Sequence, residues 1–246
     1  LQGGLRATLT ETHLLTCNGS KVMTTRHNAI SNVIVDMVKS AKLAPIVEQL
    51  ASEEHDARLR FDVSVDRIDG WSEYTKCDIT IVNPLSTHLV AKAATTARSA
   101  ADSKVTKKIA KYKPFLNQSD KFIPLVFETF GAVHPNVFNL VHTLSTRVGN
   151  QPPQSATWTA PTFTAYWMQR LSCCLWRENA RSIASTVAMT KNAYKTGVST
   201  SMDFDADFIP HQQPQQRLTL PQAPPQPLSQ PLRARSRSAQ SSRTAS

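Results

Sequence analysis

The chain has 246 residues, of which 40% are apolar, which is enough for one sizeable hydrophobic core. No apolar run approaches the roughly 18 residues of a membrane-spanning helix, and no secretory signal pattern is present, so neither a membrane span nor a signal peptide is expected. The formal net charge of +10 favours a polyanionic partner, although such an excess is as often a solubility feature.

The chain begins at Leu1 without an initiator methionine, which suggests a fragment of a longer protein. Four cysteines do not make a disulfide framework, since Cys173 and Cys174 are adjacent and Cys77 falls in a predicted core strand. The cysteine pattern therefore favours a reducing, intracellular compartment.

Apolar periodicity alternates between helix and strand along the chain. A clear amphipathic helix follows TTRHN, and LRFDVSV alternates apolar and polar residues as a half-buried strand does. In chain order, the sequence predicts a helix over 30–41, strands over 45–50, 59–65 and 76–82, a helix over 86–112, a strand over 121–128, and helices over 136–145 and 163–189.

The order α-β-β-β-α-β-α-α predicts one α/β domain over 27–196, a mixed β-sheet flanked by helices. Residues 197–246 hold seven of the 15 prolines, eight glutamines and a closing Arg/Ser run, with no apolar period. We expect a disordered tail there. Five Arg and three Asp lie in this tail, so a net charge of +8 belongs to the part before it.

Two aspartates occupy the polar alternates of neighbouring predicted strands, Asp62 in RFDVSV and Asp78 in KCDITIV. A turn-like segment joins the strands, so a hairpin would bring both carboxylates to one face, where they could share a proton or hold a divalent cation. Glu128 ends the next strand and Glu48 lies in the preceding one, so four carboxylates could converge. The alternative is a solvated sheet face.

Lysines follow these acids on the predicted helix over 86–112. Lys104, Lys107, Lys108 and Lys111 form a stripe opposite apolar residues. Such a run is commonly a solvated helix face, but beside a metal-bound phosphate it could contact a DNA backbone or stabilise developing charge.

The ordered succession of HLLTC, TRHN, RFD, KCDITIVNP, KIAKY and FIPLVFETFG, closed by AYWMQRLSCCLWRENAR, resembles the C-terminal region of non-LTR retrotransposon polyproteins. There a cysteine-histidine zinc knuckle precedes a restriction-enzyme-like endonuclease of the PD-(D/E)XK type. The resemblance runs from about His13 to Ala188. It implies a DNA-cutting domain with a mixed sheet and flanking helices, located in the nucleus.

The family's motifs fall on particular residues of this chain. The first family aspartate, in an R/K-P-D motif, matches Asp62 after Arg60, with phenylalanine in place of proline. The second acid matches Asp78, and Thr80 stands where the fold usually carries its lysine. Lys111 resembles the family's downstream lysine, and Glu128 matches a commonly acidic position.

The resemblance implies Mg²⁺ or Mn²⁺ at Asp62 and Asp78, with Lys111 and Glu128 completing the catalytic set. DNA would be the partner, with the element's RNA as a second one, and a nick would prime reverse transcription at the target. No small-molecule cofactor is implied, and any reverse transcriptase domain would lie upstream. The residues assigned to the nucleic-acid backbone are Arg60, Lys104, Lys107 and Lys108.

Residues 1–26 would then be a truncated zinc knuckle, with upstream ligands missing. His13, Cys17 and His27 are its candidate Zn²⁺ ligands, although a structural zinc site needs four. A loop cysteine and a helix-capping histidine are the plainer interpretation.

Three functions remain open from the sequence. The first is an active metal-dependent endonuclease, and the second is a decayed retroelement remnant that binds nucleic acid without cutting. The third is an interaction module that recruits partners through its Pro/Gln/Arg-Ser tail. The first function requires the Asp62 and Asp78 carboxylates to lie within reach of one metal ion, with Glu128 or Lys111 nearby, and acids that point to opposite faces of the sheet would exclude it.

Overall fold

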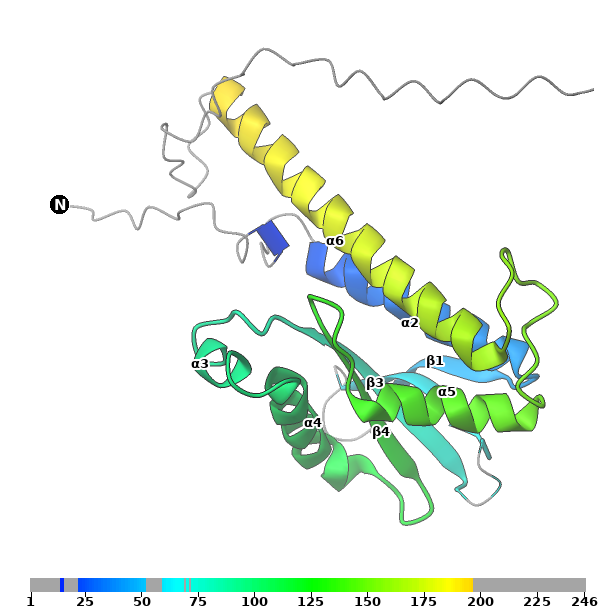
Figure 1. Cartoon of the computed structure of the whole chain (residues 1–246). Coiled ribbons are helices and arrows are strands. Elements are labelled where there is room, and N and C mark those ends of the chain that lie inside the picture. The colour runs from blue at the N-terminus through cyan, green and yellow to red at the C-terminus, as the bar shows by residue number, and fades with distance from the viewer. Residues whose placement is uncertain (1–13, 16–21, 52–58, 69, 71, 197–246) are drawn as a thin grey trace, which may run out of the picture. The chain divides into compact units, whose positions relative to one another are not determined.

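The computed structural model describes residues 14–15, 22–51, 59–68, 70 and 72–196. Within these residues, four strands form one mixed sheet with helices on both faces (Figure 1). The predicted α/β class and the order of the main elements are confirmed. His13, Cys17 and the segment 197–246 lie outside the described residues. Among the helices that are described, none is both long and apolar enough to cross a membrane.

The sheet runs β1 (Pro45–Leu50), β2 (Arg60–Asp66), β3 (Tyr74–Val82) and β4 (Lys121–Glu128), in that spatial order. Strand β2 is antiparallel to both β1 and β3, and β4 lies parallel to β3. A parallel pair needs a crossover connection, and a helix fills it here. The hairpin expected for the two aspartate-bearing strands is therefore present.

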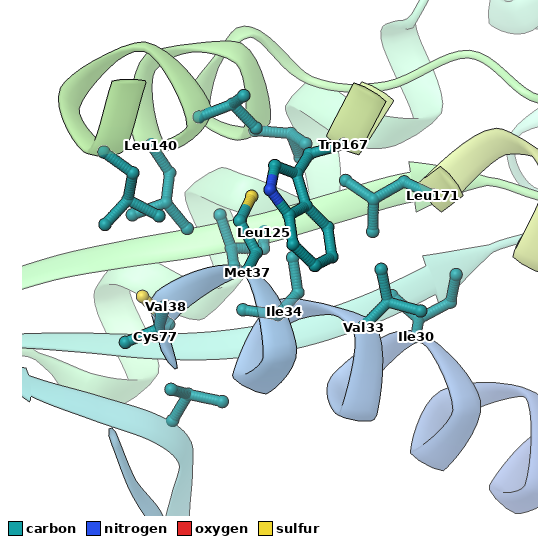
Figure 2. Packing of buried hydrophobic residues seen from close by; sticks show 14 of the residues in the cluster. Ile30, Val33, Ile34, Met37, Val38, Cys77, Leu125, Leu140, Trp167 and Leu171 are labelled. Carbon is teal, nitrogen blue, oxygen red and sulfur yellow. The ribbon is translucent and has the colours of Figure 1, made fainter. Parts of the chain in front are cut away.

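Two helices cover one face of the sheet, α2 (Val22–Ser40) and α5 (Pro135–Arg147), and α6 (Phe163–Thr196) packs against both of them. Apolar side chains of α2 recur every three or four residues, and each buried aliphatic side chain contributes about 1.5–3 kcal/mol. Figure 2 shows the Trp167 ring beside Met37 and Leu125 in this core. The buried α2 members of the core are Ile30, Val33, Ile34, Met37 and Val38.

The opposite face carries α4 (Ser99–Tyr112), preceded by the short α3 (Val90–Ala93) and followed by the 3₁₀ turn η2 (Lys113–Phe115). The prediction of one helix over 86–112 is wrong. The segment between α3 and α4 contains two threonines, which disfavour helix, and Arg98 adopts a left-handed backbone with φ 62°. After this break, α4 begins at Ser99 and packs its apolar side chains against the sheet.

Strand β2 is irregular at Asp62. Phe61 packs with α4 on one face, whereas Val63 packs with α2 on the other, although side chains two apart in a regular strand share a face. The Asp62 carboxylate accepts a hydrogen bond from the backbone N–H of Ile79, where a regular ladder would use a backbone carbonyl. On the other neighbouring strand, Glu48 has a left-handed backbone with φ 55°. Such irregularities re-aim side chains, and this one turns Asp62 toward α2.

Candidate functional site

A pocket of about 440 Å³ opens between α2 and α4, over β2 and β3. Asp62 and Asp78 both line it, so the two strand aspartates face one space. Glu48 is a third carboxylate in the lining. Cations outnumber these acids, and the basic side chains of the lining, besides His27, are Arg26, Arg60, Lys104, Lys108 and Lys111.

Asp78 is a buried carboxylate with three side-chain partners. Lys108 Nζ lies 2.8 Å from its Oδ1, and the Thr80 hydroxyl donates to its Oδ2 at 3.0 Å. The Tyr112 hydroxyl lies 2.7 Å from Oδ1. A buried carboxylate is costly unless it is paired and hydrogen-bonded, and these contacts meet that requirement. They explain why a strand tolerates an aspartate at this position.

Tyr112, the last residue of α4, joins Asp78 to strand β2. Its hydroxyl lies 2.7 Å from both Asp78 Oδ1 and the carbonyl oxygen of Arg60, so its single proton serves one acceptor at a time. Burial, and then the hydrogen bond to Asp78, raise the pKa of Tyr112 above its ordinary value. Its ring packs against Phe61 and Phe122. Tyr112 therefore acts as a neutral donor with a fixed ring.

Asp62 is held by α2 as well as by the sheet. His27 Nε2 lies 3.2 Å from Asp62 Oδ2. This hydrogen bond raises the pKa of His27 from 6.5 to about 9, against an opposing effect of burial and with further help from the charges of Asp62 and Asp78. His27 is therefore an imidazolium at neutral pH. It lies inside α2, so the interpretation of His27 as a helix cap is wrong.

Because the pKa of His27 is raised by folding, its contact with Asp62 stabilises the native state at low pH. The contribution is complete below about pH 6.5, the unfolded value, and is lost as the pH rises through about 9. We expect His27→Gln to lower the melting temperature at pH 6 and to have little effect at pH 10. Urea and thermal unfolding of both proteins across this range measure it, and a pH-independent difference would contradict the ion pair.

Lys104, Lys108 and Lys111 line the pocket from successive turns of α4, at i, i+4 and i+7. Lys108 alone reaches a carboxylate of the pocket, while Lys111 Nζ lies 5.7 Å from the centre of the Tyr112 ring. Burial, followed by the charges of Lys108 and Lys107, lowers the pKa of Lys104. Lys107 is exposed and is not part of the lining. The predicted stripe is thus present, and three of its four members face the acids.

Arg26 also lines the pocket, although it was not among the residues predicted to form the site. The residue is 3% exposed, and its guanidinium donates to Asn179 Oδ1 of α6 at 2.9 Å and to the Leu15 carbonyl at 3.2 Å. Its Nε has no hydrogen-bond partner, and no described carboxylate forms an ion pair with it. Burial lowers its pKa. Such a cation favours an anion in the pocket, and no sequence motif marks it.

Glu128 lies away from the two aspartates. It pairs with Val82 in the β3–β4 register, whereas Asp78 pairs with Pro124, which is about 13 Å further along the strand. Its Oε1 accepts a hydrogen bond from the backbone N–H of Ala101 at 3.1 Å, in the first turn of α4. Arg98 supplies no side-chain cap there, so Glu128 takes that role and complements the helix dipole. The structure gives Glu128 a contact that positions α4.

We expect Glu128→Ala to destabilise the fold by about 1–2 kcal/mol, because the Ala101 N–H loses its buried acceptor. Glu128→Gln keeps an amide oxygen and should lose less. Urea unfolding measures both, and an alanine variant as stable as the wild type would show that the contact does not hold α4.

The donor set suits Mg²⁺ better than Zn²⁺. Mg²⁺ is commonly held by one or two carboxylates together with waters and substrate phosphate oxygens, and Asp62 and Asp78 provide two carboxylates in one pocket. Zinc prefers His and Cys, and His27 is engaged with Asp62. Across the described part of the chain, no group of three or more His, Cys, Asp and Glu side chains is placed to hold a metal.

The structure therefore brings together most of the residues singled out from the sequence: Arg60, Asp62, Asp78, Lys104, Lys108, Lys111 and His27. Glu48, the third of the four carboxylates expected to converge, also lines the pocket, whereas Lys107 and Glu128 lie outside it. Arg26 and Tyr112 add groups that were not predicted. No protein-family model matches the chain, and no curated protein is significantly similar to it.

Proposed function

We propose that the pocket between α2 and α4 hydrolyses the DNA backbone with the help of a divalent metal ion. The observation that carries this proposal is the pair Asp62 and Asp78 in one pocket, with Lys108 2.8 Å from Asp78. Carboxylates for a metal and an ammonium beside them are the parts that phosphodiester hydrolysis requires. The mixed sheet with flanking helices is consistent with the restriction-enzyme-like nuclease of non-LTR retrotransposons, in which the nick primes reverse transcription.

Each residue of the pocket has a role in this proposal. Asp62 and Asp78 hold Mg²⁺ or Mn²⁺, which when bound supplies Lewis acidity to the phosphate and a lowered pKa to the attacking water. Lys108 stabilises the negative charge that develops on the phosphate. Arg26 and Lys104 contact neighbouring phosphates of the strand without reading its sequence.

Thr80 is central to the assignment of the ammonium. It occupies the position where the resembled nucleases carry lysine, and its hydroxyl donates to Asp78 instead. Lys108 reaches the same carboxylate from α4 and takes the place of that lysine in space. In this proposal the ammonium group is supplied by helix α4 and not by strand β3.

The test is nicking of supercoiled plasmid by the full chain with Mg²⁺, with Mn²⁺ and with EDTA. We expect metal-dependent conversion to open circles that EDTA stops. A filter-binding assay on the same preparations measures DNA binding at several salt concentrations, and binding should weaken steeply with salt because the contacts are to phosphates.

One observation favours the alternative, a remnant that binds nucleic acid without cutting. Lys108, Tyr112 and Thr80 already occupy the oxygens of Asp78, so a metal must displace part of this set. Salt-sensitive DNA binding with no nicking under any metal would support this alternative. Absence of both binding and nicking would exclude the two together.

A further inference from the structure

A second pocket, of about 710 Å³, shares no lining residue with the first. It lies between the C-terminal half of α2, the N-terminal half of α6 and the segment around Trp158. Its lining contains a single carboxylate, Asp36, and three cations, Lys39, Arg170 and Arg177. The proposed cleavage does not involve this pocket.

Trp158 is its most exposed aromatic side chain, at 37%. Its ring stacks on Tyr166 with centroids 4.5 Å apart and 29° between the planes. Its Nε1 donates to Gln169 Oε1 at 2.9 Å. Tyr166 is itself fixed edge-on against the buried Trp167. The indole is therefore held in one orientation before any ligand arrives, which lowers the entropic cost of stacking on it.

The cations of the pocket differ in how far they are neutralised. Arg170 is paired with Asp36 at 2.6 Å and lies over the Trp167 ring at 4.9 Å, so its charge is balanced. The exposed Arg177 shares the buried Glu178 with Arg181. Lys39, exposed in the last turn of α2, forms no ion pair with any residue in the described part of the chain. The lining thus carries a net positive charge beside a stacking surface.

We infer that this second pocket binds an unpaired nucleotide of a single nucleic-acid strand, with the base stacked near Trp158 and the adjoining phosphate near Lys39 and Arg177. A flat aromatic surface with adjacent cations is the combination that single-strand binding uses. A base inside a duplex is already stacked on its neighbours and has no free face to offer. The predicted preference is therefore for single strands over duplexes of the same sequence.

Fluorescence anisotropy with a labelled single-stranded 12-mer and its duplex tests the preference. We expect Trp158→Ala to weaken single-strand binding about tenfold, since one base loses its stacking surface, and to leave duplex binding unchanged. Trp158→Phe should keep most of the affinity, which guards against loss of folding in the alanine variant. Trp176→Ala is the matched control, because Trp176 is 52% exposed on α6 and outside the pocket.

Lys39→Ala should flatten the dependence of log K on log salt for the single strand by about 0.7, the value for one phosphate contact. The control Lys92→Ala removes a charge from α3, outside the pocket, and should change the slope for the single strand far less. Equal losses for single strand and duplex, or no loss with Trp158→Ala, would overturn the inference. Binding of adenosine monophosphate as tight as that of the 12-mer would overturn the assignment to a strand.

Cys173 gives a readout local to the pocket, because it is exposed and lines it. Burial raises the pKa of the Cys77 and Cys174 thiols and leaves them slow to react. With Cys17 replaced by Ser, alkylation by a maleimide reports on Cys173. The 12-mer should slow this reaction and the duplex should not, and this holds whether or not the acidic pocket cuts DNA. An unchanged rate with saturating 12-mer would overturn the inference.

Discussion

Asp78→Asn is expected to lower Mg²⁺-dependent nicking by about a thousandfold or more, since the proposed metal site would lose a charge worth several kcal/mol in the transition state. Asp62→Asn should have an effect of the same order. DNA binding should stay intact or become tighter in both variants, because each removes a negative charge from the pocket that we propose to bind phosphates. Nicking rates at saturating protein and filter binding measure the two effects separately.

Asp66→Asn is the matched control for these variants. Asp66 ends the same strand as Asp62, its side chain is 63% exposed, and it lies outside the pocket. It should nick at the wild-type rate. Because Asp78→Asn leaves Lys108 partly buried without its partner, thermal unfolding must show that the variant is folded. Folded variants that cut as fast as the wild type would remove Asp62 and Asp78 from the active site.

Strands β2 and β3 were predicted from alternating apolar and polar residues, and β4 from its continuous apolar run, which the structure buries on both faces. The break before α4 could not be read in this way, since alanine-rich sequence around Thr95 and Thr96 keeps a helical period. The left-handed Arg98 directly precedes α4, and the first turn of α4 is held by Glu128, which lies 27 residues from Ala101 in the chain. Such long-range capping leaves no local pattern.

The candidate site was predictable to a similar extent. Two aspartates on neighbouring strands predicted a shared pocket, and both line one. Regular alternation could not predict how Asp62 reaches it, because β2 is irregular at this residue and the Asp62 carboxylate contacts His27 of α2. Arg26 could not be recognised, because its importance comes from burial against α6, residues far away in sequence. Helical spacing placed several lysines on one face, and only packing decides which of them meets Asp78.

Which lysine lies beside Asp78 determines which lysine substitution should lower the nicking rate most. The sequence resemblance pointed to Lys111, whereas the structure puts Lys108 Nζ 2.8 Å from Asp78 and Lys111 Nζ over the Tyr112 ring. We therefore expect Lys108→Ala to lower the nicking rate by about two orders of magnitude or more at saturating protein, as loss of a preorganised charge beside the phosphate does. Lys111→Ala should lower it less than about tenfold.

Lys104 and Lys107 separate catalysis from binding within the same helix. Lys104→Ala removes a cation from the pocket and should weaken DNA binding, reducing the slope of log K against log salt by about 0.9, while the rate at saturation stays near the wild type. Lys107→Ala, outside the pocket, is the control for removing one charge from α4. A large rate loss at Lys111 with none at Lys108 would return the ammonium to Lys111. Four similar, small losses would mean that α4 only attracts DNA, because a uniform profile is what a solvated basic face produces.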